Sequence, residues 1–575
     1  MKYVILDNTA INENYMKKIA ILISFIISSE IFGQEIELIN ENYSIPNYNT
    51  QKLSSLCKIW GFLKYYHPSV AKWKGDWDSE LTKMIKKVNN AKDKDELSTI
   101  YLDWIESLGK IKKCSSCEKY NYKETFNSNL DFSWMNSDVL LSQKLITTLV
   151  NIKNNRNVGK NKFIKTNIFI GNPKNKNENA YLDSVQPSYE LRLIGLFRYW
   201  NVVNYFFPYK YLMSENWDQV LNDMIPKFSS AINSRQYHLV IMELTAKLDD
   251  GHARFRSPYA KDFFGNKNAS FQCKFLDSKA VVTSQYNDSL SKIDDVRIGD
   301  VILKIDNKSI NDIYQERKHY FGASNEAARW LYMRNVIFTG DKDTLNIQFE
   351  RDGLLQHKTI HRYENNLLYN VWQPNKMPLS KIIDNVIGYV NMEALYRSQV
   401  KKTMKSLMQC RGIIFDLRGY PNGTYRKILA YLNDESRPFV KFSTPKIDYP
   451  GLYDFKTVYY TGYHSKNYFK GKVVILINET TQSHAEFTAM ALKSTPNATI
   501  IGNNSAGADG DISLVTFPGG IKTYFSGIGV YFPDGRETQR IGLIPDIVCS
   551  PTISGIRENK DEQLERAIQF IKFGK

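Results

Sequence analysis

The stretch that most constrains the fold is Lys472–Leu492, which reads KVVILINETTQSHAEFTAMAL. It begins with an unbroken apolar run from Val473 to Ile477, as expected for a strand that is covered on both faces. Helix-forming residues follow from Ala485, so Ser483 is predicted at a strand-to-helix turn. At such a turn the first N–H groups of the helix can stabilise an oxyanion, and the serine hydroxyl can face outward.

The same residues also have a structural interpretation. Ser483 and Glu486 fit the S-x-x-E capping box, in which the serine only satisfies free N–H groups at a helix start. Both interpretations agree with the tetrapeptide, so the rest of the chain has to decide between them.

Length and composition indicate a globular protein of several domains. A chain of 575 residues is too long for one hydrophobic core, and 13% aromatic residues supply ample core material. The net charge of +16 comes from basic residues scattered through Asn-rich and Lys-rich segments. Without an Arg-rich arm, this pattern predicts a solvated basic surface and no nucleic-acid partner.

The start of the chain resembles an export signal. Met16, Lys17 and Lys18 precede the apolar run from Ile19 to Ile27, which is too short to span a bilayer, and small or polar residues follow up to Gln34. We therefore expect a signal peptide within residues 1–34 that starts at Met16. The product would be exported, periplasmic or extracellular, and without a stable membrane span.

The cysteines give one candidate pair. In an exported protein, Cys114 and Cys117 could close a small disulfide, whereas a zinc site would need two further ligands that do not occur nearby. No metal or cofactor is predicted. The other four cysteines are expected to be isolated buried thiols: Cys57, Cys273, Cys410 and Cys549.

The N-terminal half contains two copies of one segment at an offset of 140 residues. Trp60 matches Trp200, and Trp77 matches Trp217 (200 − 60 = 217 − 77 = 140). Apolar residues recur at helical spacing in both copies, which predicts a duplicated α-helical region with about three helices in each copy.

The two copies end differently. Only the second carries an imidazole at its end, in Asp250-Gly251-His252. Gly251 can end a helix in the left-handed conformation, which leaves His252 just past the helix end. A lone histidine is more often structural than catalytic, so its role depends on the remaining motifs.

Two further patterns follow the repeat. Residues 267–362 contain short strands, and Arg297–Ile310 resembles the strand-turn-strand core of a PDZ domain, which binds a peptide as an added strand. The alternative is a generic β-rich module. Tyr314–Val336 is predicted to be helical and Thr344–Arg351 to be a closing strand. From residue 380 onward strands alternate with helices, which indicates an α/β layer structure.

The expected domain boundaries follow from these changes of pattern. They are 50–150 for the first helical copy, 151–187 for an Asn-rich and Lys-rich linker or exposed loop, 188–258 for the second copy, 267–362 for the PDZ-like domain and 380–572 for the α/β core. Within the core we expect strands at Val386–Val390 and Thr499–Gly502. We also expect one helix that ends at Met408, another that begins at Tyr425, and a final helix after the N-cap Asp561.

Over residues 250–572 these motifs resemble the tail-specific, or C-terminal processing, serine peptidases. The resemblance rests on the DLRG turn at Asp416–Gly419 with Gly423, on Thr481-x-Ser483-x-x-Glu486, on Ile501-Gly502 and on Gly542-x-x-Pro545-Asp546. It implies a ClpP-like (crotonase-like) α/β core and a PDZ-like domain that presents protein or peptide substrates. It also implies acyl transfer by Ser483 without metal or cofactor.

The expected base is a histidine. The better-known members activate the serine with a lysine about twenty-five residues downstream, but no lysine occurs between Lys493 and Lys522. The tricorn-like branch instead has a D-G-H segment before its PDZ domain, which His252 matches. His484 adjoins the serine, but helix neighbours point about 100° apart, so we prefer His252.

Further site residues follow from the resemblance. The tricorn-like pattern places a glutamate a few residues before G-x-x-P-D to orient the imidazole. Glu537 is the candidate, five residues before Gly542 (542 − 537), while Gln539 is nearer the expected spacing. The oxyanion hole is expected from the backbone N–H groups of His484 and Gly423.

These patterns together predict an exported serine endopeptidase that works through an acyl-enzyme. Asp416 and Arg418 are expected only to hold the DLRG turn in shape. The alternative is a non-catalytic peptide- or lipid-binding protein, because the interphotoreceptor retinoid-binding protein shares this core and acts as a carrier. The sequence leaves the natural substrate and the oligomeric state open.

Overall fold

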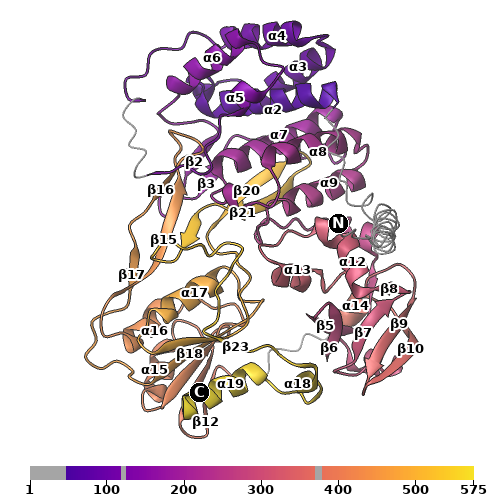
Figure 1. Ribbon diagram of the computed structural model, residues 1–575, viewed down its shortest axis with the longest axis vertical. Helices are drawn as coiled ribbons and strands as arrows, with labels where there is room; N and C mark the ends of the chain where they lie inside the picture. Colours follow the sequence, from indigo (N-terminus) through magenta and orange to yellow (C-terminus); the bar gives the residue numbers. More distant parts are fainter. Residues whose placement is uncertain (1–46, 118–124, 370–377, 575) are drawn as a thin grey trace, which may run out of the picture. The chain divides into compact units, whose positions relative to one another are not determined.

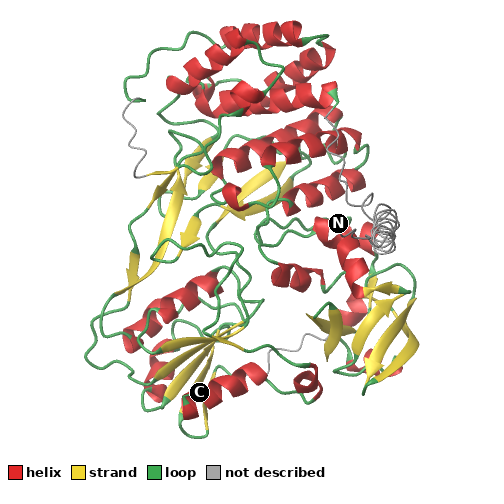
Figure 2. Ribbon diagram, viewed as in Figure 1, coloured by secondary structure: helices red, strands yellow, loops and turns green. Residues whose placement is uncertain are grey.

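The computed structural model describes residues 47–117, 125–369 and 378–574, and the predicted signal peptide lies outside these ranges. Within the described ranges, Thr50 onward forms one compact unit. Figure 2 shows mainly helices in the N-terminal half and mixed strands and helices after it. None of the helices in the described ranges is long and apolar enough to cross a bilayer.

The two sequence copies fold into the same elements (Figure 1). The first copy contains α2 (Tyr48–Tyr66), α3 (Trp77–Asn90) and α4 (Lys94–Ser107), and the second contains α7 (Tyr189–Phe206), α8 (Trp217–Ser230) and α9 (Ser234–Ala246). Even single hydrogen bonds recur. The Trp60 indole N–H donates to the Trp77 carbonyl at 3.3 Å, and that of Trp200 donates to the Trp217 carbonyl at 2.8 Å.

The copies pack against each other about an approximate two-fold axis. Lys58 pairs with Asp218 at 2.9 Å, and Arg198 pairs with Asp78. These ion pairs are equivalent, because the offset of 140 converts Lys58 into Arg198 and Asp78 into Asp218 (58 + 140 = 198, 78 + 140 = 218). Such reciprocal contacts are those of an isologous interface.

Residues 151–187, predicted to be a linker or exposed loop, connect the two copies and are partly packed against the C-terminal half. The end of α6 (Gln143–Asn154) extends into this segment, and β2 (Ile164–Thr166) pairs with β3 (Pro173–Asn175). The Asn172 side-chain amide donates to the Ile512 carbonyl at 2.7 Å, and the Ser513 hydroxyl donates to the Pro173 carbonyl at 2.7 Å. Asparagine side chains that a composition argument assigns to solvent thus bind backbone groups of a distant hairpin.

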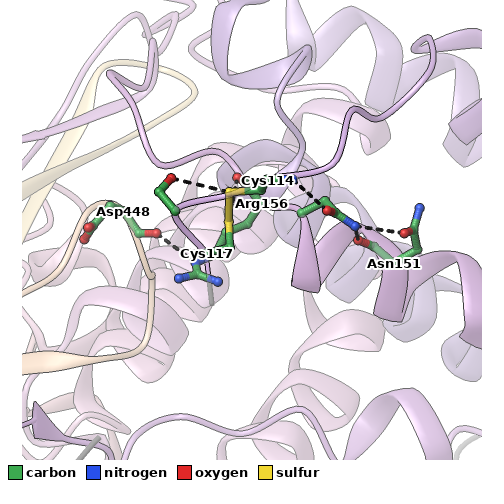
Figure 3. Close-up of a disulfide and its surroundings, with 7 residues drawn as sticks. Cys114, Cys117, Asn151, Arg156 and Asp448 are labelled. Carbon is green, nitrogen blue, oxygen red and sulfur yellow. Dashed lines mark hydrogen bonds between the residues drawn. A yellow bond between two sulfur atoms is a disulfide. The ribbon is translucent and has the colours of Figure 1, made fainter. Parts of the chain in front are cut away.

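Cys114 and Cys117 form a disulfide with an S–S distance of 2.11 Å (Figure 3). The Cys117 sulfur lies 3.6 Å from the Arg156 carbonyl oxygen, and the Arg156 Nε–H donates to the Asp448 carbonyl at 3.0 Å. The loop is thereby attached to the C-terminal half. Of the remaining thiols, Cys57 and Cys273 are buried, but Cys410 and Cys549 are only half-buried, which corrects the expectation for those two.

Residues 267–364 form a β-rich module around one antiparallel sheet. Its strand order is β10-β9-β7-β6-β5, with β5 Phe271–Leu276, β6 Lys279–Gln285, β7 Val301–Ile305, β9 Thr344–Arg351 and β10 Leu354–His361. The single helix expected over Tyr314–Val336 is instead two, α12 (Ile310–Arg317) and α13 (Glu326–Met333). The break arises because Asn325 caps a new helix by accepting from the Ala328 N–H at 3.0 Å.

The C-terminal part is built on a six-stranded sheet of order β12-β13-β14-β18-β19-β23, parallel except for β12. Its strands are β12 Ser380–Ile383, β13 Ile387–Asn391, β14 Gly412–Asp416, β18 Lys472–Ile477, β19 Ala498–Gly502 and β23 Ile547–Val548. The carboxyl ends of β14, β18 and β19 meet at one edge, as parallel strands require.

Helices cover both faces of this sheet (Figure 1). One face carries α15 (Val400–Leu407), α16 (Tyr425–Leu432) and α17 (His484–Lys493), and the other carries α19 (Glu562–Phe573). Within β18, Val473 and Ile475 belong to the first core, whereas Val474 and Leu476 belong to the second. The apolar run thus forms a strand covered on both faces. The helix expected directly after β13 begins only at Val400.

A second set of strands lies beside this sheet. The hairpin β20 (Ile512–Phe517) and β21 (Ile521–Ser526) is followed by β22 (Gly529–Tyr531), which pairs with the long strand β15 (Arg437–Pro445). Strand β15 also pairs with β16 (Tyr453–Phe455) and β17 (Tyr459–Thr461).

Candidate active site

Ser483 lies between β18 and α17 in a strained conformation. Its φ is 57° and its ψ is −124°, a combination that costs a serine about 1–3 kcal/mol. Ser142, Ser188 and Ser309, which cap other helices, have the usual extended conformation with φ of −77°, −61° and −65°. Ser483 is therefore not an ordinary cap. A strained serine at a strand-to-helix turn is typical of a nucleophile whose hydroxyl is held outward.

The buried carboxylate of Glu486 holds this turn in place. It accepts hydrogen bonds from the backbone N–H groups of Ser483 (3.0 Å), Gly507 (2.8 Å) and Ala508 (3.0 Å) and from the Ser505 hydroxyl (2.5 Å). The Glu486 half of the predicted capping box is thus present, and it also binds the loop after β19. Burial raises the pKa of Glu486 to about 6, although the four donors oppose this shift.

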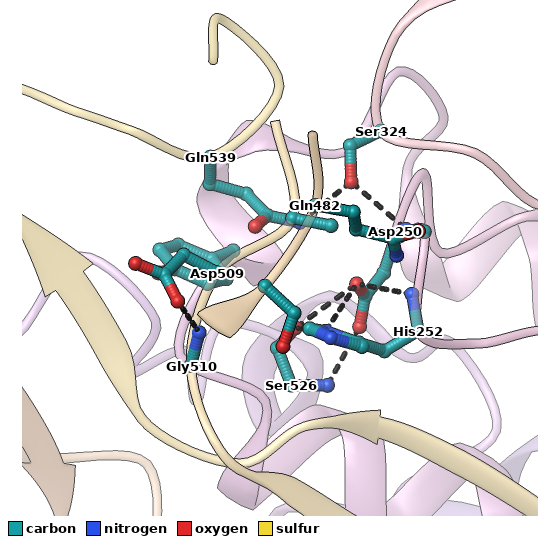
Figure 4. A network of polar contacts seen from close by, with 12 residues as sticks. Asp250, His252, Ser324, Gln482, Asp509, Gly510, Ser526 and Gln539 are labelled. Atoms are coloured by element: carbon teal, nitrogen blue, oxygen red, sulfur yellow. Dashed lines mark hydrogen bonds and ion pairs between the residues drawn. The ribbon is translucent and has the colours of Figure 1, made fainter. Parts of the chain in front are cut away.

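His252 is bound to a buried carboxylate through a serine (Figure 4). Its Nδ1 lies 2.8 Å from the Ser526 hydroxyl and 3.7 Å from Oδ1 of Asp250. The Ser526 hydroxyl donates to Asp250 Oδ1 at 3.0 Å, and the Ser526 N–H donates to Oδ2 at 2.6 Å. With a proton on Nδ1, Nε2 is a free acceptor. Burial lowers the pKa of His252, and the Asp250 charge partly opposes this, so the neutral imidazole prevails near pH 7.

The structure brings the His252 segment into contact with the Ser483 turn, although 231 positions separate the two residues (483 − 252). A Cβ atom on Gly251 would lie 2.9 Å from Cβ of Ala508 and 3.0 Å from the Gln482 side-chain nitrogen. The Ala508 carbonyl accepts from the Ser483 N–H at 2.9 Å. The histidine segment therefore touches the neighbours of Ser483 on two sides.

The two residues predicted for the oxyanion hole are also neighbours. Gly423 has a φ of 65°, and a Cβ atom there would lie 3.6 Å from Nε2 of His484. The Arg397 Nε–H donates to the Gly423 carbonyl at 3.1 Å, which fixes the peptide. In the parts of the chain that the structure describes, neither the Gly423 N–H nor the His484 N–H has an acceptor. Both are thus available to a developing oxyanion.

The His484 side chain is engaged in aromatic packing. Its ring lies 6.1 Å from that of Tyr425 and 6.2 Å from those of Tyr420 and Phe487. This placement agrees with the argument that neighbouring helix residues do not face each other. Of the two candidate bases, His252 is the one that is bound, through Ser526, to the carboxylate of Asp250.

The turn after β14 is held by ion pairs. Arg418 donates to both carboxylate oxygens of Asp416 (2.9 and 2.7 Å) and to both of Asp561 (2.8 and 2.8 Å). The Thr481 hydroxyl donates to the Leu417 carbonyl at 2.9 Å, which connects this turn to that of Ser483. Asp416 and Arg418 therefore have the structural position expected of them.

The structure does not bring Glu537 to the imidazole, which corrects its expected role. Its carboxylate accepts from the Tyr211 hydroxyl, and burial raises its pKa. Gln539, the residue at the better spacing, is bonded to the Ser324 hydroxyl at 3.2 Å rather than to His252. Position in sequence relative to G-x-x-P-D therefore does not identify the orienting group here.

Asp250 and Ser526 take the place intended for the glutamate. Asp250 belongs to the D-G-H segment, so its position two residues before His252 could have been used to predict it as the orienting carboxylate. Ser526 lies on β21, 274 positions from His252, and no pattern in the sequence connects them. Across the described ranges, no group of three or more His, Cys, Asp and Glu side chains is placed to hold a metal ion.

Comparisons with known proteins show a peptidase family match and similar solved structures. Residues 386–549 match the model of Peptidase family S41. Mature CPAF complexed with lactacystin has a similar structure, with a TM-score of 0.52 and 14% identity over 67% of this chain and 99% of that one. A serine-to-alanine mutant of CPAF matches with a TM-score of 0.51 and 16% identity over 67% of this chain and 98% of that one.

A third structure, the tricorn protease, matches with a TM-score of 0.34 and 15% identity over 67% of this chain and 37% of that one. That likeness is too weak to assign the tricorn-like branch. No curated protein matches the chain. Residues 386–549, the segment that contains Ser483, thus match a serine peptidase family, and the chain shares its fold with CPAF.

Proposed function

We propose that this peptidase cleaves peptide bonds within protein chains through an acyl-enzyme on Ser483, with His252 as the general base. The observation that carries the proposal is the strained Ser483 turn in contact with a histidine segment whose imidazole is bound, through Ser526, to a buried carboxylate. A serine hydroxyl needs such a base because it is too weak an acid to attack an amide unaided.

In the proposed reaction His252 acts first as a base and then as an acid. Nε2 of His252 takes the hydroxyl proton while Oγ of Ser483 attacks the carbonyl carbon, and the N–H groups of Gly423 and His484 bind the oxyanion. The imidazolium then donates its proton to the leaving amine, and water hydrolyses the acyl-enzyme by the reverse sequence. Each oxyanion donor is expected to contribute about 10²- to 10³-fold in rate.

We further propose that the β-rich module presents the substrate, in the manner of a PDZ domain. Strand β5 is an edge of its described sheet, so a peptide can add to it as a further strand. Two contacts support this placement. The Lys274 ammonium on β5 lies 2.8 Å from the Glu479 carboxylate, and the Tyr332 hydroxyl on α13 donates to the Gln482 side chain at 2.8 Å. Both partners belong to the Ser483 turn.

Export is proposed on the signal-like sequence that starts at Met16. The disulfide between Cys114 and Cys117 supports it, because such bonds persist mainly in oxidising compartments. N-terminal sequencing of the protein from its native host should find a mature chain that begins near Gln34. An intact N-terminus on cytosolic protein would refute this proposal.

The proposed function is tested with Ser483→Ala, which should lose at least about 10⁴-fold in cleavage of an unstructured protein. The matched control is Ser494→Ala, at the other end of the same helix, which should keep the wild-type rate. A fluorophosphonate should add its mass to Ser483 in the wild type. Equal cleavage by wild type and Ser483→Ala, or ligand binding without labelling, would instead favour the binding-protein alternative.

A further inference from the structure

A pocket of about 580 Å³ is lined in part by Phe487, on the helix α17 that follows Ser483. Two residues that line it, Tyr425 and Phe487, have rings that pack against the His484 ring. Asp511 also lines it, and its charge partly opposes the lowering of the pKa that burial causes in both His252 and His484. The pocket therefore shares two aromatic side chains with the surroundings of His484, the residue after Ser483.

The described residues that line this pocket are mostly aromatic. Two of its fourteen lining residues, Arg426 and Asp511, are charged, and Arg426 is engaged with the Tyr425 hydroxyl at 3.0 Å. The aromatic ones come from the loop between β2 and β3, from α16 and α17, from β15, and from β17 and the residues just after it. They are Phe169, Tyr425, Phe439, Phe442, Tyr459, Tyr460, Tyr463 and Phe487.

One wall is the tip of the β2–β3 hairpin, in the segment whose composition suggested a linker. Phe169 and Ile170 line the pocket, yet the Phe169 side chain is 90% exposed. The base of the hairpin is fixed. Gly171 has a φ of 93°, and a Cβ atom there would lie 2.6 Å from the Thr444 methyl group, while Asn172 is bonded to the Ile512 carbonyl. An anchored loop thus holds an uncovered phenyl ring at the pocket margin.

We propose that this pocket binds a large apolar or aromatic side chain of the substrate next to the cleaved bond, and that Phe169 packs over it. Rings lining the walls can contact such a side chain in offset or edge-to-face geometry, and its burial would also cover Phe169. An alanine side chain would leave most of 580 Å³ unfilled. This inference rests on the proposed function and adds to it the class of side chain that is recognised.

The test uses two series of quenched fluorescent peptides. In one series the varied residue lies before the cleaved bond, and in the other it lies after it. Within each series the varied residue is Phe, Leu, Ala or Asp. For one series, kcat/KM of the wild type should be at least about tenfold higher with Phe than with Ala. Phe169→Ser should reduce this Phe-to-Ala ratio about threefold or more. Ile168→Ser is the matched control, because Ile168 is 87% exposed on the same tip but does not line the pocket.

The control should keep the wild-type ratio within about twofold. Equal kcat/KM for Phe and Ala in both series, or equal effects of the two variants, would overturn the inference. Calorimetry on Ser483→Ala with the same peptides separates this result from a failure of the proposed function. If the wild type cleaves nothing, tighter binding of the Phe peptides still supports the pocket, and equal binding of Phe and Ala peptides rejects it.

Discussion

At the residue scale, the site depends on how His252 is held. Asp250 is completely buried and accepts three hydrogen bonds, from the His252 N–H (3.0 Å), the Ser526 N–H (2.6 Å) and the Ser526 hydroxyl (3.0 Å). The carboxylate therefore fixes both the backbone of the histidine and the serine that its imidazole contacts. Its charge would also stabilise the imidazolium that forms during catalysis.

Asp250→Asn should lower kcat about 10²-fold and change KM little, because the imidazolium loses its counter-charge while the substrate contacts remain. Asp249→Asn is the matched control. Asp249 is the adjacent residue, but its carboxylate binds the Ser214 N–H at 2.9 Å and lies near the guanidinium groups of Arg329 (3.5 Å) and Arg540 (3.6 Å). Steady-state kinetics that found the two variants equally active would contradict the role given to Asp250.

The pH dependence of kcat/KM follows from the same residue. The base must be neutral, so activity is lost as pH falls through the pKa of His252. Burial lowers that pKa from its ordinary value of 6.5, so the acid limb of the profile should have its midpoint below pH 6.5. In His484→Gln the midpoint should stay unchanged, whatever its rate. A midpoint that shifts in His484→Gln would contradict the assignment of His252 as the base.

At the scale of elements, two contacts connect the β-rich module to the Ser483 turn. One is the ion pair between Lys274 on β5 and Glu479, whose side chains are 21% and 15% exposed. The other comes from Tyr332 on α13, which bonds to Gln482 and stacks on Arg254, with 3.8 Å from the guanidinium carbon to the ring centre. Movement of the module would therefore displace Glu479 and Gln482, which belong to the same turn as Ser483.

A charge exchange tests this connection. Lys274→Glu alone should lower kcat/KM for an unstructured protein about fivefold, because two carboxylates then face each other at the turn. Glu479→Lys alone should do the same, and the double variant should recover most of the loss. A double variant as slow as the slower single variant would mean that the ion pair does not connect module and site.

At the scale of the whole molecule, the duplication has become an internal pseudo-dimer. Tyr65 and Tyr205, equivalent in the two copies, have ring centroids 5.5 Å apart. Near the same axis, the Asn201 amide donates at 2.9 Å to the carbonyls of both Cys57 and Phe197, which are themselves equivalent (57 + 140 = 197). Gly61 is the counterpart of Asn201 (61 + 140), and a Cβ atom on it would lie 1.8 Å from the Asn201 side-chain oxygen.

This symmetry gives a sharp stability prediction. Gly61→Asn should destabilise the protein by more than about 3 kcal/mol, because its side chain would overlap that of Asn201. The exchange Gly61→Asn with Asn201→Gly should recover most of the loss, since the new asparagine reaches the same two carbonyls by symmetry. Thermal unfolding measures both. A double variant less stable than Gly61→Asn alone would show that the axis does not relate these positions.

The sequence by itself determined the features that arise from neighbouring residues. The apolar run of β18, the helices of both copies and the turn at Ser483 all follow from burial periodicity and local backbone preference. The helix end expected at Gly251 was wrong, because α9 ends at Ala246 and the left-handed residue is Asp249, with a φ of 50°. Breaks between helices were predicted poorly, because periodicity and local preference do not locate them. The start of α13 at Asn325 depends on one capping side chain that competes with a continuous helix.

Only the tertiary structure decided which distant side chains meet. Ser526 reaches His252 from a hairpin 274 positions away, and Glu537 is bonded to Tyr211. The hairpin that holds Phe169 is anchored to the C-terminal half, within a segment predicted to be a linker or exposed loop. Such contacts are set by the pairing and packing of elements far apart in the chain, and neighbouring residues carry no record of them. That is the physical reason why the nucleophile could be predicted and its supporting residues could not.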